Sequence, residues 1–227
     1  MLRLHIVALV NRNISMSRIL IAGMLIFASF SALGQFGLSV KYQSVVSSEF
    51  SDLLENMGAT YSDHLVGGSI FYWFRLKNRR MEFLPEIGYV RTINNSNEVY
   101  VAHLQKILVS FNTNIYLFDF EGDCNCPTFS KQGGYYQKGF FVEITPGMDI
   151  QFFKMDPIDG VDFSDTALTF RIGLGVGFDF GVSDMVTITP TVGMNWSSSP
   201  SWYDHIGGTG GEWVFSAGLR ALFRPDY

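Results

Sequence analysis

The stretch from residue 169 to residue 180, TFRIGLGVGFDF, alternates strictly between two kinds of side chain. Its even positions are all large and apolar, whereas its odd positions hold Thr169, Arg171, three glycines and Asp179. Because successive side chains of a β-strand point to opposite faces, this pattern predicts one strand with a bulky apolar face and a small or polar face.

The same alternation recurs along the chain, in eight segments of roughly ten residues, which is the length of a membrane-spanning β-strand. The segments are residues 36–43, 66–76, 81–90, 106–117, 140–152, 169–180, 186–196 and 213–223. In 36–43, for example, Phe36, Leu38, Val40 and Tyr42 share one face. The pattern predicts an all-β fold, an eight-stranded antiparallel up-and-down transmembrane β-barrel.

A soluble β-sandwich or lipocalin-like barrel would also alternate, but two features favour the membrane. The non-apolar face is rich in Gly, Ser, Thr and Asn rather than Lys and Glu, as in the narrow interior of a small barrel. Aromatic residues also gather near the strand ends, as in the girdles of membrane barrels. One predicted rim holds Tyr42, Tyr89, Phe152, Trp196 and Trp213, and the other holds Phe74, Phe178, Phe180 and Phe223.

The N-terminus resembles an export signal. Arg12 and Arg18 precede the short apolar run 19–34, which ends in small residues and is too short for a spanning helix. We therefore expect a signal peptide over 1–34, cleaved before Gln35, and one barrel domain over 35–227. All 21 acidic residues and 13 of the 16 basic residues follow the signal, giving a formal charge of −8, which argues against a nucleic-acid partner.

The connections predict the orientation, because short turns face the periplasm and long loops face outward. Residues 77–80, 118–138 and 181–184 are the predicted periplasmic links. The predicted extracellular loops are about 45–63, 92–99, 154–166 and 198–210. The link 118–138 is far longer than a periplasmic turn needs to be.

The signal, the eight segments and a last strand that ends in an aromatic residue, Phe223, together resemble the small outer-membrane barrels of the OmpA and OmpX type. They are also similar to the generic outer-membrane barrel domain of bacteria with type IX secretion. The resemblance implies that Phe223 contributes to the signal read by the insertion machinery, although RPDY follows it here.

The face opposite the lipid carries charges of both signs. They are Lys41, Arg75, Lys106, Arg171 and Arg220 against Glu82, Glu86, Glu143, Asp149 and Asp179. A selective pore favours one dominant sign, and eight strands leave an interior that side chains can fill. We expect an internal network of ion pairs and hydrogen bonds that plugs the barrel, with Glu86, Glu143 and Arg220 in its periplasmic half.

No enzyme motif stands out. His64, His103 and His205 lie near predicted outer loops, where Ser62 and His64 share a face, so a lipid-modifying enzyme at the rim is one alternative. The loop 154–166 carries an aspartate at every third position but lacks the spacing of a calcium loop. We expect no metal and no cofactor.

Cys124 and Cys126 lie in the long link, where export to an oxidising compartment favours a local disulfide over free thiols. Aromatic residues in the same link suggest an ordered segment, either a lid on the lumen or a docking surface for a periplasmic or outer-membrane protein. The partners expected are therefore outer-membrane lipid and a protein that binds residues 118–138.

The sequence thus predicts an outer-membrane barrel without enzymatic activity, an interaction or accessory subunit of an envelope machine for secretion or outer-membrane assembly. The alternatives are the rim enzyme and a narrow pore for small solutes.

Overall fold

The computed structural model describes residues 35–46, 60–76, 79–93, 101–118, 120, 139–158, 161–183, 185–201 and 210–223. The chain divides into two units, and every strand lies in the unit that runs from Gln35 to Pro225. The predicted signal peptide and both cysteines lie outside the described residues. No helix within the described part is long and apolar enough to cross a membrane.

Eight strands form the wall of a closed barrel, and three two-residue strands extend or flank it. The wall strands are β1 (Phe36–Val46), β3 (His64–Tyr72), β5 (Met81–Thr92), β6 (Val101–Ile115), β7 (Phe140–Ile158), β8 (Val161–Phe178), β10 (Val186–Ser197) and β11 (Glu212–Phe223). The short strands are β2 (Thr60–Tyr61), β4 (Phe74–Arg75) and β9 (Phe180–Gly181).

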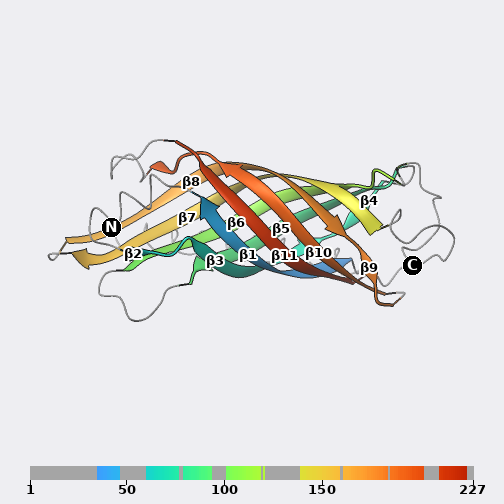
Figure 1. Ribbon diagram of the computed structural model, residues 1–227, viewed down its shortest axis with the longest axis horizontal. Helices are drawn as coiled ribbons and strands as arrows, with labels where there is room; N and C mark the ends of the chain where they lie inside the picture. The colour runs from blue at the N-terminus through green and yellow to red at the C-terminus, as the bar shows by residue number, and fades with distance from the viewer. Residues whose placement is uncertain are drawn as a thin grey trace, which may run out of the picture. The chain divides into compact units, whose positions relative to one another are not determined.

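Each wall strand pairs antiparallel with its neighbours in the order β1, β3, β5, β6, β7, β8, β10, β11, and β11 pairs with β1 to close the ring. Figure 1 shows these strands running obliquely around the barrel. The predicted eight-stranded antiparallel barrel is confirmed. Closure removes the sheet edges around the ring where all eight strands pair, as a membrane-spanning sheet requires.

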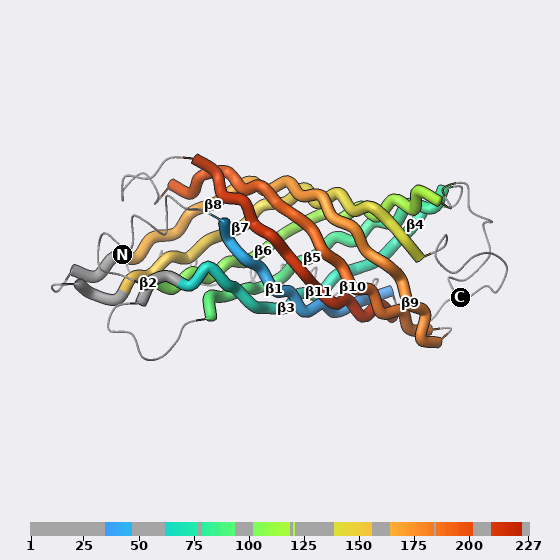
Figure 2. Tube along the Cα trace, viewed as in Figure 1, coloured from blue at the N-terminus to red at the C-terminus, as the bar shows by residue number. Residues whose placement is uncertain are grey.

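The two ends of the barrel differ (Figures 1 and 2). At one end, which we call the terminal end, β1 begins at Phe36 and β11 ends at Phe223, close to β9. At the other end, which we call the hairpin end, the β7–β8 hairpin reaches farther than the other strands, and β2 lies beside β6.

One predicted connection is wrong. Residues 154–166 were expected to form an extracellular loop, but β7 continues to Ile158 and β8 begins at Val161, with Ile158 paired to Val161. Lys154 pairs with Ser164, and both side chains are exposed on the outer face. The wall here stays extended while its outer face becomes polar, so Asp156, Asp162 and Asp165 lie on strands rather than in a loop, and Asp159 lies outside the described residues.

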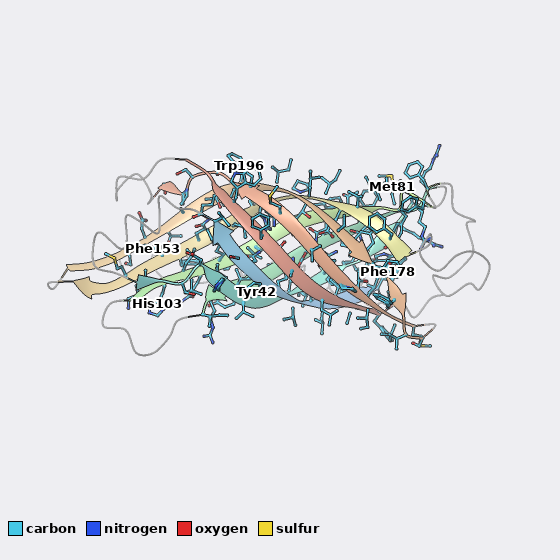
Figure 3. The ribbon with its side chains drawn as sticks, viewed as in Figure 1. Tyr42, Met81, His103, Phe153, Phe178 and Trp196 are labelled. Atoms are coloured by element: carbon cyan, nitrogen blue, oxygen red, sulfur yellow. The ribbon has the colours of Figure 1, made fainter. Side chains whose placement is uncertain are left out.

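The outer surface is apolar across the strands. The residues of the opening stretch show this well: Leu174 is 64% exposed and Ile172 is 57% exposed, whereas Arg171 is buried. In Figure 3, Met81 and Phe178 lie toward the terminal end, and Tyr42 and Trp196 lie toward the hairpin end. Apolar side chains that face outward from a closed barrel face lipid, with aromatic residues near its boundaries.

Candidate functional site: the filled lumen

The interior of the barrel is filled in layers. Toward the hairpin end it holds an apolar layer, and a smaller apolar layer lies toward the terminal end. The first consists of Val45, Leu65, Val90, Ala102, Leu104, Leu108, Phe153, Met155, Ala167 and Val214. The second consists of Phe71, Trp73, Leu84 and Leu222. Charged and polar side chains lie between them.

Glycines make room for some of these interior rings. A Cβ atom added at Gly37 would lie 2.1 Å from the ring of Phe71, and one added at Gly177 would lie 2.3 Å from the ring of Phe141. The glycines that alternate with bulky residues along β8 therefore leave space on the inner face that side chains from other strands can occupy. At Gly177 the missing side chain is replaced by an aromatic ring from the neighbouring strand β7.

Arg220 on β11 and Glu143 on β7 form a bidentate ion pair. Arginine Nη2 donates to Glu143 Oε1 at 3.0 Å, and Nη1 donates to Oε2. β8 and β10 separate the two strands in the wall, so the pair spans the lumen. The planar guanidinium matches the two carboxylate oxygens, which gives this contact a fixed geometry as well as charge neutralisation.

Glu86 on β5 is the centre of a second group. Its carboxylate lies 2.5 Å from Lys41 Nζ on β1. It also accepts hydrogen bonds from the side chains of Ser69 and Asn112, and Ser69 in turn contacts Ser39. Glu86 is buried, and a buried carboxylate needs this kind of pairing and hydrogen bonding to remain charged.

Closer to the hairpin end, Lys106 on β6 donates to Glu212 Oε2 on β11 at 3.0 Å. These strands lie on opposite walls of the ring of eight, and both side chains are 2% exposed. Arg171 Nη2 lies 3.3 Å from Asp149 Oδ1, an ion pair without hydrogen-bond geometry. The Lys106–Glu212 pair therefore crosses the lumen, whereas the Arg171–Asp149 pair joins the neighbouring strands β8 and β7.

Tyr116 is the centre of a hydrogen-bond network at the terminal end of the lumen. Its hydroxyl lies 2.9 Å from Glu82 Oε2 and 2.5 Å from Asp179 Oδ2, so it joins β5 to the segment between β8 and β9. Thr189 also donates to Asp179, at 2.5 Å. The guanidinium of Arg80 lies 4.3 Å from the centre of the Tyr116 ring, a cation–π contact that covers the network.

A small cavity lies among the polar side chains of the lumen. A cavity of about 30 Å³ is lined in part by Lys41, Asn112, Glu143, Arg171 and Arg220. Such a volume holds about one water molecule. Asn112 Oδ1, Arg171 Nε and Arg220 Nε have no hydrogen-bond partner among the described protein atoms, so water in this cavity would have polar groups to bind.

The ten charged residues singled out in the sequence lie on the inner face or at its end. Eight of them are buried: Glu82, Glu86, Lys106, Glu143, Asp149, Arg171, Asp179 and Arg220. Lys41 and Arg75 are partly buried, and Arg75 pairs across the strands with Glu82. Phe223 ends β11 opposite Val186 and is 48% exposed. Within the described residues, no group of three or more His, Cys, Asp or Glu side chains is placed to hold a metal ion.

Sequence reasoning missed Glu212, Tyr116 and both apolar layers. Glu212 lies one residue before the predicted last strand, and Tyr116 has the inward parity of the 106–117 segment but carries no charge. For the apolar layers a signal existed. Leu104 and Leu108 have the same parity as Lys106, and Phe153 has the same parity as Asp149, so an inward-facing apolar layer could have been inferred.

No protein-family model matches the sequence, and no curated protein matches it significantly. Among solved structures, Ail, the attachment invasion locus protein of Yersinia pestis, matches with a TM-score of 0.52 and 12% identity, over 85% of this chain and 99% of that chain. The N-terminal β-barrel domain of Pseudomonas aeruginosa OprF gives 0.48 and 14%, over 84% and 99% of the two chains. Neisserial surface protein A gives 0.45 and 15%, over 82% and 95%.

At these identities the likeness concerns the fold. With the closed ring of strands and the apolar outer surface, the fold defines the class: the protein is a small eight-stranded outer-membrane β-barrel of the OmpA/OmpX-like type. It resides in the outer membrane, with its strands across the bilayer.

Proposed function

We propose that the protein is a non-conducting, non-enzymatic barrel that acts as an interaction or accessory subunit of an envelope machine for secretion or outer-membrane assembly. The observation that carries the proposal is the filled lumen. The Arg220–Glu143 pair lies between two apolar layers, beside a cavity of about 30 Å³, and the Lys106–Glu212 pair crosses the lumen within the layer at the hairpin end. A barrel whose described interior is filled in this way would have its rims and outer face available for function.

The hairpin end supplies a surface suited to docking. β8 pairs with β10 only from Arg171 to Gly177, beyond which Ser198 N donates to Phe170 O. From Val161 to Thr169, the described strands pair with β8 on one side alone, through β7. A strand edge of this kind can accept another strand by main-chain hydrogen bonding. In the proposed orientation this end faces the outside of the cell.

The rim-enzyme alternative receives no support from the histidine it would use. The Ser62 hydroxyl accepts a hydrogen bond from the backbone amide of His64 at 3.4 Å. The His64 imidazole instead contacts the Tyr42 hydroxyl through Nδ1 at 2.8 Å. A nucleophilic serine would need the imidazole itself as its base.

Two measurements test the proposal. In planar bilayers the purified protein should add no steady conductance, and well-defined single-channel currents would overturn the plugged barrel in favour of a narrow pore. In cells, a photo-crosslinking residue at Thr166, on the exposed β8 edge, should yield one discrete protein adduct. The same residue at the lipid-facing Phe111 is the matched control. Absence of an adduct specific to position 166 would contradict docking at this edge.

A further inference from the structure

The lipid-facing surface of the barrel is hollowed on one side. A groove of about 720 Å³ crosses β7, β8, β10 and β11 and reaches β1, and its lining is almost wholly apolar. Leu174, Val192, Met194, Phe215 and Ala217 form much of it, and Tyr42 and Ser44 form its β1 end. It is a shallow groove, open to the surrounding bilayer, rather than an enclosed pocket.

The pairing of the strands creates this groove. Val142 pairs with Val176, Val176 pairs with Val192, and Val192 pairs with Ala217, so a row of small outward side chains crosses four strands. The row ends at the larger Tyr42, which pairs with Ala217. The next row toward the hairpin end is bulkier, because Leu174 pairs with Met194 and Met194 pairs with Phe215. The hollow therefore belongs to the fixed register of the sheet rather than to a mobile loop.

The β1 end of the groove is polar and lies near one cation, Arg91. Tyr42 is stacked on His64, with ring centres 5.6 Å apart and the hydroxyl 2.8 Å from Nδ1. Val66, the neighbour of Tyr42 on β3, pairs with Arg91 on β5, and the Arg91 side chain is exposed on the same outer face. The outward residues Phe170 on β8, Trp196 on β10 and Trp213 on β11 carry no charge.

We propose that this surface binds one phosphate-bearing membrane lipid, with an acyl chain along the groove and the phosphate beside Tyr42, His64 and Arg91. The apolar part matches a hydrocarbon chain, and it already lies among lipid chains because the strands span the bilayer. Arginine donates hydrogen bonds to phosphate oxygens. The Tyr42–His64 pair adds one donor, which is either the His64 Nε2–H or the Tyr42 hydroxyl, because one hydrogen is used in their mutual hydrogen bond. The site is independent of the docking role proposed above.

Retention of lipid tests the site. The intact protein is reconstituted in nanodiscs that contain equal phosphatidylglycerol and phosphatidylcholine, released into detergent, and weighed by native mass spectrometry. We expect wild type to retain one lipid, mainly phosphatidylglycerol, and expect the same result when lipid A replaces phosphatidylglycerol. Excess inorganic phosphate should leave the lipid in place, because the chain contributes to binding. Displacement by phosphate alone would overturn the proposed acyl-chain contact.

Paired variants separate the groove from its polar end. Ala217→Trp fills the groove and should abolish retention, whereas Val109→Trp, an equally lipid-facing position on β6, should not. Val192→Phe serves as a second groove variant if Ala217→Trp does not fold.

A second pair of variants tests the polar end of the groove. Arg91→Gln should reduce the preference for phosphatidylglycerol roughly tenfold, because a charge-assisted hydrogen bond is lost. Lys154→Gln, the same charge change elsewhere on the rim, should leave it unchanged. Equal retention by the groove variants and Val109→Trp, or an unchanged preference in Arg91→Gln, would overturn the site.

Discussion

Arg220 on β11 and Glu143 on β7 meet in the middle of the barrel, although two wall strands separate them around the ring. The two side chains can meet only when the sheet from β7 to β11 curls inward in the observed register, because β7 and β11 are three places apart in the ring. The pair therefore reports on closure as well as on local charge. Lys106 and Glu212 repeat this arrangement nearer the hairpin end.

The first prediction concerns this pair. Arg220→Met or Glu143→Gln alone leaves a buried charge without its partner and should cost about 3–5 kcal/mol in the free energy of unfolding, less if water enters the lumen. The double variant should lose much less than the sum of the two single losses. Denaturant titration followed by heat-modifiable gel migration measures all three. Simple additivity would show that the two side chains do not interact in the folded barrel.

The second prediction concerns the membrane-facing side of β8. Leu174→Arg places a cation against lipid near the bilayer middle and should cost roughly 2–4 kcal/mol. Ser164→Arg is the matched control, because it lies on the same face of the same strand but on the exposed hairpin extension. It should insert and migrate like wild type. If both variants behave alike, either the membrane boundary or the assignment of the faces is wrong.

The third prediction concerns two adjacent glycines of β3. A Cβ atom at Gly67 would lie 1.9 Å from the carbonyl oxygen of Tyr89 and 2.6 Å from the Cα of Val90, both part of the β5 backbone. At Gly68 its nearest neighbour would be Ser39 O at 3.1 Å. Gly67→Ala should therefore destabilise by about 1–3 kcal/mol, since backbone cannot move aside, and Gly68→Ala should cost clearly less. Thermal unfolding of the two variants decides; equal losses would contradict the close approach of β3 and β5.

Much of the wall was predictable because alternation is a local property. Leu174 and Gly175 alternate in the sequence as they do in the barrel, and the lipid supplies a uniform reason for every outward residue to be apolar. The prediction of the β7–β8 connection was wrong because those strands continue beyond the part of the wall that faces lipid. Beyond Phe152 and Leu168 the outer face turns polar while the strands continue, so the β7–β8 hairpin looked like a loop.

The ion pairs inside the lumen could not be predicted from the sequence, for a different reason. The sequence places Arg220 and Glu143 on the inner face, but which charges meet depends on the stagger with which the eight strands close. The apolar layers were missed because the inner face was expected to be small and polar throughout. Leu104 and Phe153 show that large apolar side chains fill the hairpin end instead.

The last prediction concerns the long link between β6 and β7, most of which lies outside the described residues. Phe120, near its start, contacts the preceding turn: Phe120 O accepts a hydrogen bond from Arg80 N at 3.1 Å, and the Arg79 guanidinium lies 5.0 Å from the centre of the Phe120 ring. Phe118 remains 66% exposed beside them. Periplasmic turns of small barrels need only a few residues. We therefore propose that the additional residues of this link dock a periplasmic or outer-membrane protein.

Replacing residues 121–136 with a short Gly-Ser turn keeps Phe118, Phe120 and their contacts while it removes Cys124, Cys126 and the aromatic residues between them and β7. We expect the variant to fold, as judged by heat-modifiable migration, and to lose a protein that co-purifies with wild type from detergent-solubilised envelopes. A double Cys124→Ser, Cys126→Ser variant shows whether a disulfide contributes to that loss. Failure of the shortened barrel to fold would identify the link as a structural lid on the lumen. Unchanged folding with an unchanged set of co-purifying proteins would exclude the link as the docking surface.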